Sequence, residues 1–202
     1  CSALPSPVSR SSDLEYARSI ERVKDYIRSG DVYQVNLSRR LETAAPEQSE
    51  ARRLFGRLAE RAGAPFSAYL ETPEQTLISA SPERFLRVSG GRVETCPIKG
   101  TRPRGGTPAA DSALLAELER SEKDRAEHMM IVDLERNDLG RVCETGSVRV
   151  TRLCEPRSYS DVHHLVSRVE GRLRDPSDWL ALFEATFPGG SITGAPKLRA
   201  MQ

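Results

Sequence analysis

Apolar residues at helical spacing define the first predicted element of the chain. They recur every three or four positions, at Leu14, Ala17, Ile20, Val23 and Ile27. Ser12 and Glu15 stand three residues apart at the start of this run, which is the spacing of a capping box. Gly30 follows the run and favours its termination. The pattern therefore predicts a helix between Ser12 and Gly30.

The spacing of apolar residues also predicts the further elements of the chain. Helical spacing predicts helices over residues 49–61, 111–120, 121–138 and 177–187. In the first of these, Leu54, Phe55 and Leu58 are expected to face inward, and Ser121 with Asp124 fits the start of the third. Alternating or short apolar runs predict strands over residues 32–41, 66–70, 76–81, 84–89, 92–97, 148–153 and 162–173.

The order of these elements indicates the fold class. Strands and helices arrive in mixed order, and hairpins such as the one expected at Gly90-Gly91 outnumber strict βαβ units. We therefore expect an α+β fold with largely antiparallel sheets and flanking helices. The Ser/Pro-rich residues 1–12 are expected to form a linker, and residues 13–202 one domain.

The last predicted helix is short. Pro196 suits its first turn, but only six residues follow (202 − 196). A helix of one or two turns is marginal without a continuation. We expect both ends to be cuts through a longer protein, with a C-terminal portion of the domain missing.

Composition argues against several classes of protein. Lys+Arg 30 against Asp+Glu 29 gives a net charge of +1, which points to neither nucleic acid nor an anionic membrane surface. No segment approaches the roughly 20 apolar residues of a membrane span, and no secretory signal pattern opens the chain. The four cysteines form no CxxC pair, so reduced thiols and a cytoplasmic location are expected.

Lys99 is the first candidate for chemistry. It lies in Pro97-Ile98-Lys99-Gly100-Thr101, with two arginines following at 102 and 104. Nearby cations and desolvation both disfavour an ammonium, so such a lysine can supply a free amine as nucleophile or base. Glu83 precedes it by sixteen positions (99 − 83), across the expected Gly90-Gly91 hairpin, and could act as general acid. A cation-rich surface turn and a glutamate paired with arginine are the alternatives.

Three other clusters invite a functional reading. Asp124 and Glu127 share one helix face and could hold Mg2+, although a solvated charged face is the simpler explanation. His163 and His164 are neighbours on a strand and should face opposite sides of the sheet. Residues 189–197 form a glycine-rich loop before a helix, which suits an anion or an ordinary turn; neither the P-loop nor the GxGxxG pattern is present.

Taken together, these segments resemble one family. The motifs that carry the resemblance, in order, are Asp31-Val32-Tyr33-Gln34-Val35-Asn36-Leu37, Ser81-Pro82-Glu83-Arg84-Phe85, Pro97-Ile98-Lys99-Gly100-Thr101, Asp124-Arg125-Ala126-Glu127-His128, Val132-Asp133-Leu134-Glu135-Arg136-Asn137-Asp138, His163-His164-Leu165-Val166-Ser167 and Phe187-Pro188-Gly189-Gly190-Ser191-Ile192-Thr193-Gly194-Ala195-Pro196-Lys197. The chain is similar to the chorismate-binding domain shared by anthranilate, aminodeoxychorismate, isochorismate and salicylate synthases. The resemblance covers nearly everything after the linker.

The resemblance implies a role for each candidate residue. Lys99 would be the nucleophile, Glu83 the general acid and His164 an active-site histidine. Glu127 would bind Mg2+, with Asp124 in an outer or water-bridged position. The residues implied in substrate binding are Gly100, Thr101, Gly194, Ala195 and Lys197.

The lysine also separates members of the family. Pro-Ile-Lys-Gly-Thr is typical of the enzymes that form 4-amino-4-deoxychorismate for p-aminobenzoate and folate synthesis, whereas anthranilate synthases typically carry alanine where Lys99 stands. Ammonia would come from a glutaminase subunit or fused domain, since no glutaminase signature is present. Anthranilate, isochorismate or salicylate synthesis are the alternatives, and so is a non-catalytic chorismate- or partner-binding module. Because the remaining carboxylate ligands of the family lie in the missing segment, we expect the 202-residue chain alone to be inactive.

Overall fold

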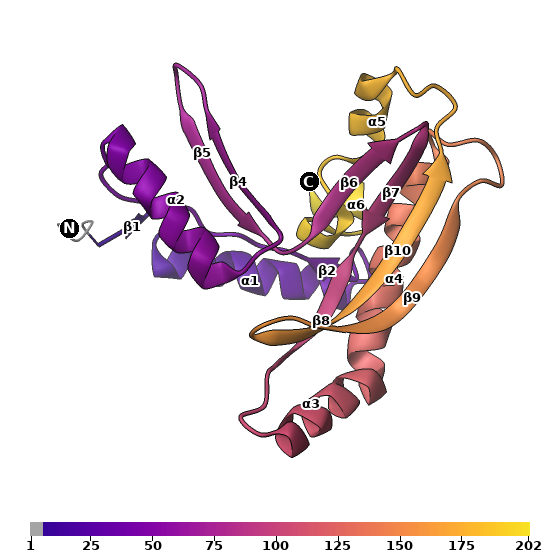
Figure 1. Ribbon diagram of the computed structural model, residues 1–202, viewed down its shortest axis with the longest axis horizontal. Coiled ribbons are helices and arrows are strands. Elements are labelled where there is room, and N and C mark those ends of the chain that lie inside the picture. Colours follow the sequence, from indigo (N-terminus) through magenta and orange to yellow (C-terminus); the bar gives the residue numbers. More distant parts are fainter. Residues whose placement is uncertain (1–5) are drawn as a thin grey trace. The chain divides into compact units, whose positions relative to one another are not determined.

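The computed structural model describes residues 6–202, which form two compact units (Figure 1). The first unit is Cys1–Pro82 and the second is Glu83–Gln202. Residues 1–5 of the expected linker lie outside the described residues. Every candidate site residue named above belongs to the second unit.

The first unit contains two helices and short antiparallel pairings. Its elements are β1 (Val8–Ser9), α1 (Asp13–Arg28), β2 (Gln34–Val35), β3 (Leu41–Glu42), α2 (Gln48–Ala62), β4 (Phe66–Glu71) and β5 (Thr76–Ser81). Strand β1 pairs with β3, and β4 pairs with β5 in a hairpin whose two strands were predicted. The predicted helix 49–61 is confirmed as α2, although Leu58 remains 37% exposed and Ala51 is the residue that is buried.

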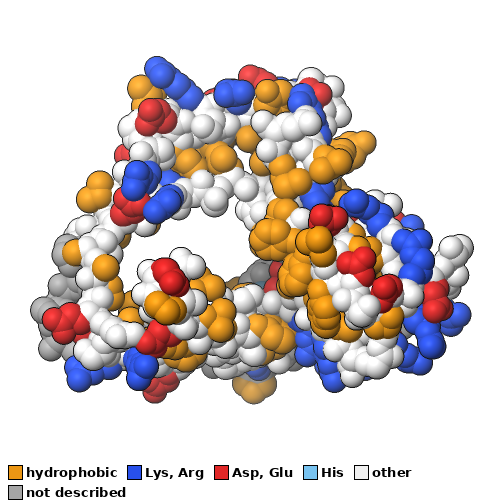
Figure 2. Space-filling view, turned by 90° about the horizontal axis from the view of Figure 1, so that it is seen from above, with side chains coloured by type: hydrophobic (Ala, Val, Ile, Leu, Met, Phe, Trp, Pro, Cys, Tyr) orange, Lys and Arg blue, Asp and Glu red, His pale blue; other side chains and the backbone are white. Residues whose placement is uncertain are grey.

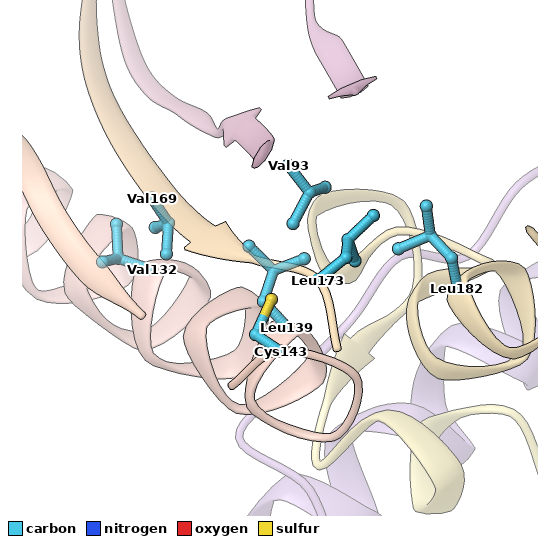
Figure 3. Close-up of a cluster of buried hydrophobic side chains, with 7 residues drawn as sticks. All are labelled: Val93, Val132, Leu139, Cys143, Val169, Leu173 and Leu182. Carbon is cyan, nitrogen blue, oxygen red and sulfur yellow. The ribbon is translucent and has the colours of Figure 1, made fainter. Parts of the chain in front are cut away.

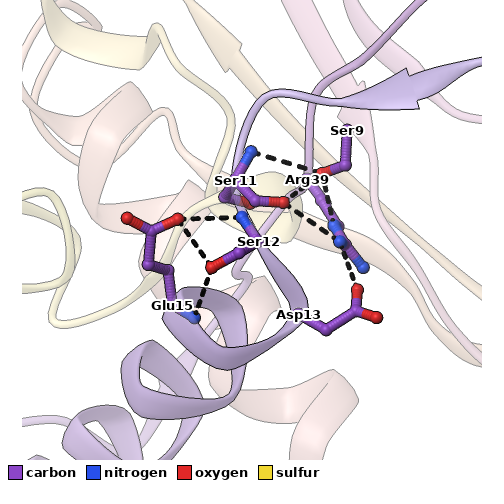
Figure 4. Close-up of polar contacts among 6 residues, drawn as sticks. All are labelled: Ser9, Ser11, Ser12, Asp13, Glu15 and Arg39. Carbon is purple, nitrogen blue, oxygen red and sulfur yellow. Dashed lines mark hydrogen bonds and ion pairs between the residues drawn. The ribbon is translucent and has the colours of Figure 1, made fainter.

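The capping box predicted at the start of α1 is confirmed (Figure 4). The Ser12 hydroxyl accepts the backbone N–H of Glu15, and the Glu15 carboxylate accepts the backbone N–H of Ser12 at 2.8 Å. Arg39 donates to Ser9 and Asp13 beside this cap. The helix start thus satisfies its own unpaired N–H groups, as the local sequence indicated.

The strand predicted over residues 32–41 is wrong for most of its length. Within it, only Gln34–Val35 and the final residue, Leu41 of β3, belong to strands. Val32 is 3% exposed but Tyr33 is 70% exposed, so the alternation reflects an extended connection with one anchoring side chain. A period of two describes extended backbone and does not by itself supply a pairing partner.

A five-stranded antiparallel sheet dominates the second unit. Its strands are β6 (Arg84–Ser89), β7 (Arg92–Cys96), β8 (Ile98–Pro103), β9 (Arg149–Ser158) and β10 (Val162–Arg172). Strand β10 is central, because it pairs with β9 along one edge and with β8 and then β7 along the other. Four of these strands were predicted, but β8 was missed, and β8 carries Lys99.

Three helices and a short C-terminal segment accompany this sheet. They are α3 (Pro108–Arg120), α4 (Glu122–Gly140) and α5 (Trp179–Thr186), followed by a 3-10 turn (Gly190–Ile192), β11 (Gly194–Ala195) and α6 (Lys197–Ala200). Helix α4 runs along one face of the sheet (Figure 1). Ser121 caps α4 as predicted, by accepting the N–H of Asp124.

The core lies between α4 and the sheet. The side chains that form it come from β7, β10, α4, α5 and the segments after α4 and β10: Val93, Val132, Leu139, Cys143, Val169, Leu173 and Leu182 (Figure 3). Along β10 every second residue is buried against this core, so His163 is fully buried while His164 lies on the other side. The predicted opposition of the two histidines is confirmed.

The architecture confirms the α+β class with antiparallel sheets. Within residues 6–202, no helix is long and apolar enough to cross a membrane. Basic, acidic and apolar side chains all occur on the face shown in Figure 2, in keeping with the net charge of +1.

Candidate active site

A bulge in β8 sets the direction of Lys99. On β10, His164 pairs with Thr101 and Leu165 pairs with Lys99, so Gly100 is the extra residue. Gly100 has φ +73°, and a Cβ there would lie 2.9 Å from Leu118 Cδ1. Only glycine meets both conditions without strain. The Gly in Pro-Ile-Lys-Gly-Thr is therefore a structural requirement for presenting the lysine.

Ser191 joins the predicted nucleophile to the predicted acid. Its hydroxyl donates to Glu83 Oε2 at 2.8 Å, and its carbonyl accepts from Lys99 Nζ at 3.2 Å. Glu83 Oε1 accepts the backbone N–H of Ile98 at 2.9 Å. The structure thus brings Glu83 and Lys99 together, as their spacing across the hairpin indicated.

The environment of Glu83 favours its protonated form. Burial raises the pKa of this carboxyl above its ordinary value, although the hydrogen bonds from Ile98 and Ser191 and the charge of Lys99 act in the opposite direction. A carboxylic acid whose pKa is raised holds its proton more readily and can deliver it to a leaving group. Glu83 has the properties of a general acid.

His164 pairs with Thr101 across the β8–β10 ladder, next to the position where Leu165 pairs with Lys99. Its Nδ1 is 3.2 Å from the carbonyl oxygen of Gly100 and 3.0 Å from Thr101 Oγ1. Because a carbonyl only accepts, the contact with Gly100 requires the proton on Nδ1 and leaves Nε2 to accept. The charge of His164 also acts on the pKa of Glu83, which places the two groups in one electrostatic environment.

The two arginines after Lys99 are engaged elsewhere. Arg102 pairs with Glu117 at 2.8 Å and with Asp124 at 3.0 Å, and Arg104 pairs with Asp111 at 2.8 Å. Their charges are therefore compensated by carboxylates from α3 and α4. The expectation that these cations act directly on the lysine loses its geometric basis.

The predicted metal ligands lie one turn apart on α4. Hydrogen bonding with Ser121 and the ion pair with Arg102 lower the pKa of Asp124, so its carboxylate is ionised but held by a guanidinium. Glu127 is half-buried. Among residues 6–202, no group of three or more His, Cys, Asp or Glu side chains could hold a metal ion. Mg2+ commonly takes one or two carboxylates and completes its shell with water and substrate, and Glu127 fits that role better than Asp124.

Lys197 is buried in an ion pair. Its ammonium donates to Asp138 Oδ2 and to the carbonyl of Thr186, and the residue is 8% exposed. A substrate carboxylate would have to displace Asp138 to reach it. The position suits a side chain that fixes the C-terminal loop to α4, and the substrate contact implied by the resemblance stays a prediction. Gly194 and Ala195, which precede it, are buried.

The loop before Lys197 also packs tightly on α4, at Gly190. A Cβ at Gly190 would lie 2.8 Å from Leu134 Cδ2 and 3.7 Å from Glu135 Cγ. Because Gly190 has no side chain, the 3-10 turn rests directly on the helix. This contact holds Ser191 next to Glu83.

Glu135 was not anticipated from the sequence. The residue is 8% exposed, and its carboxyl accepts the Thr95 hydroxyl at 2.7 Å. Burial raises its pKa to about 8, and the charges of Glu83 and Asp138 act in the same direction. Its position among charged residues on α4 gave no signal of burial. Ser191 was also missed, although it lies in the glycine-rich loop 189–197 that was predicted to suit an anion.

The chain belongs to the family of chorismate-binding enzymes. The family model described as chorismate binding enzyme matches residues 3–202. Anthranilate synthase component 1 1 of Haloarcula marismortui is 52% identical over 187 residues, which are 93% of this chain and 38% of that protein. Aminodeoxychorismate synthase component 1 of Bacillus subtilis is 48% identical over 187 residues, which are 93% of this chain and 39% of that protein.

A solved structure agrees with this assignment. Anthranilate synthase component I from Streptococcus pneumoniae superposes with a TM-score of 0.84 and 33% identity, covering 98% of this chain and 43% of that one. The chain thus spans about two fifths of the length of the relatives it matches. The fold and family predicted from the motifs are confirmed.

Proposed function

We propose that the protein containing this chain converts chorismate and ammonia into 4-amino-4-deoxychorismate, the precursor of p-aminobenzoate. The observation that carries the proposal is the link through Ser191 between Lys99 Nζ and the carboxyl of Glu83. An amine and a carboxyl whose pKa is raised, held together, suit a substitution in which one attacks and the other protonates the leaving group.

In the proposed first step, the nitrogen lone pair of Lys99 Nζ forms a bond to C2 of chorismate. The two ring double bonds shift towards C4, the C4–O bond breaks, and Glu83 supplies the proton that turns the departing hydroxide into water. In the second step ammonia forms a bond to C4, the double bonds shift back, and the C2–N bond to Lys99 breaks. Covalent attachment divides one difficult substitution into two easier ones.

The other residues would bind and orient the substrate. Gly100 and Thr101 follow Lys99 on β8, and His164 contacts both of them through Nδ1. Gly194 and Ala195 would supply backbone contacts at the loop. Glu127 would hold Mg2+, with Asp124 in an outer position, and the ion would neutralise a substrate carboxylate when bound. Ammonia would come from a glutaminase subunit or a fused glutaminase domain, in the cytoplasm.

The test uses the full-length gene product with chorismate, Mg2+ and an ammonium salt, and separates the products by chromatography. The proposal predicts 4-amino-4-deoxychorismate and its loss in Lys99→Ala. Omitting ammonia should leave a covalent adduct on the peptide that contains Lys99, detectable by mass spectrometry. Anthranilate as product would favour the function named for the Haloarcula relative, and isochorismate or salicylate would favour the other branches.

The chain alone, without the remainder of the protein, is expected to be inactive. Its two carboxylates on α4 are too few for a tight Mg2+ site, and one of them is paired with Arg102. Amination of chorismate by the 202-residue chain would contradict this expectation.

A further inference from the structure

A hollow opens on the sheet of the second unit where β7, β10 and β9 run side by side. Its volume is about 430 Å3, and its lining includes Arg92, Arg149 and Arg172. This volume lies within the range of about 300–1,000 Å3 that is typical of small-molecule sites. The three guanidiniums define what we call the arginine hollow.

Strand register brings these arginines together. Arg172 on β10 stands directly opposite Arg92 on β7, and Glu170 stands opposite Arg149 on β9. Like charges that face each other across a strand pair destabilise it. An anion bound between the arginines would offset that repulsion.

The acidic residues of the region do not neutralise the hollow. Glu170, which also lines it, accepts from Thr151 at 3.2 Å and pairs with Arg168 at 3.5 Å. Arg172 is 3.3 Å from Glu144. Between residues 6 and 202, neither Arg92 nor Arg149 makes a hydrogen bond or ion pair through its side chain. Three cations and one carboxylate leave the lining positive.

The floor of the arginine hollow is fixed by the core beneath it. A Cβ at Gly171 would lie 2.5 Å from Cys143 Sγ, so β10 packs directly on the segment after α4. Val169 and Leu173, on either side, are 0% and 5% exposed. The arginines therefore project from a rigid surface, and a planar guanidinium fork on such a surface can bind an oxyanion through two parallel hydrogen bonds.

We propose that the arginine hollow binds a small metabolite that carries two or more oxyanion groups, either phosphates or carboxylates. The site is separate from the candidate active site, because Arg172 is eight residues from His164 along β10 (172 − 164), or about 27 Å of strand. The inference does not depend on which reaction the protein catalyses.

The experiment titrates the 202-residue chain with pyrophosphate, and in parallel with citrate, in 150 mM NaCl. Calorimetry and the shift in melting temperature report binding. We expect saturable binding of at least one probe, weakened by added salt, and weakened about tenfold or more in the double variant Arg92→Gln/Arg149→Gln. Pyrophosphate alone would indicate a phosphate-bearing ligand, and citrate alone a polycarboxylate.

The matched control is Arg53→Gln/Arg57→Gln, which removes the same charge from exposed positions on α2. It should bind as the parent chain does, and circular dichroism should show that both double variants are folded. Equal loss in the control would mean general charge attraction and would overturn the proposal, as would no saturable binding at millimolar probe. Binding lost in Lys99→Ala but kept without Arg92 and Arg149 would place the anion in the candidate active site instead.

Discussion

Replacing Glu135 by glutamine tests the buried acid beside Glu83. Burial raises the pKa of Glu135 to about 8, whereas the ordinary value is 4.5. Between these pH values the unfolded chain has released this proton and the folded chain has kept it. Stability contributed by the protonated group is therefore fully present below pH 4.5 and is lost as the pH rises towards 8.

The magnitude follows from the same two values. Between pH 5 and pH 7 this group should lower the free energy of unfolding by about 2–3 kcal/mol, at about 1.4 kcal/mol per pH unit. Glutamine has the shape of the protonated acid, can accept the Thr95 hydroxyl and does not titrate. Relative to the parent chain, Glu135→Gln should therefore become more stable by about 2–3 kcal/mol over this interval, or roughly 4–12 °C in melting temperature.

The assay is urea unfolding of both chains at pH 5, 6 and 7, followed by circular dichroism and by the fluorescence of Trp179. Trp179 is the single tryptophan of the chain and lies on α5 in the second unit. The matched control is Glu119→Gln, at an exposed position on α3, which should show no comparable pH dependence. Parallel stability curves for the parent chain and Glu135→Gln would refute the reasoning, because they would mean that Glu135 titrates alike in both states.

Three further substitutions test the geometry around the site. Lys197→Met should lower the free energy of unfolding by about 3–5 kcal/mol, because it leaves the carboxylate of Asp138 buried without a partner. Adding Asp138→Asn should restore much of that stability. Unchanged unfolding with only a raised KM would instead assign Lys197 to the substrate. Gly100→Ala should destabilise the chain by about 1–3 kcal/mol and lower kcat/KM in the full-length protein, since φ is +73° and Leu118 leaves no room for a Cβ. Parent-like values would mean that the bulge does not require glycine. Leu139→Ala, at a core residue 1% exposed, should lose about 2–5 kcal/mol in denaturant unfolding, and a loss below 1 kcal/mol would show that the core closes around the gap.

Local signals predicted the elements that depend on local physics. The capping box at Ser12, the cap at Ser121 and the hairpin at Gly90-Gly91 each involve residues within a few positions of one another. The predictions failed where pairing with a segment distant in the sequence determines the local structure. The alternation over 32–41 lacks a matching ladder for most of its length, and β8 forms because β10, some sixty residues later, pairs with it.

The candidate site shows the same division. The types and order of Glu83, Lys99 and His164 could be read from the motifs, because the chemistry requires those side chains. The bond from Ser191 to Glu83 spans 108 positions, and the bond from Lys99 to Ser191 spans 92. No periodicity in the sequence encodes contacts at that separation.

The sequence by itself determined the family of this protein, its α+β class and the side chains able to supply a nucleophile and an acid. Only the tertiary structure decided what those side chains touch. It buried Lys197 against Asp138, gave the arginines after Lys99 their own carboxylates and enclosed Glu135 beneath the turn that carries Ser191. The physical reason is that charge, desolvation and hydrogen bonding depend on distances in space, and packing around α4 and β10 sets those distances.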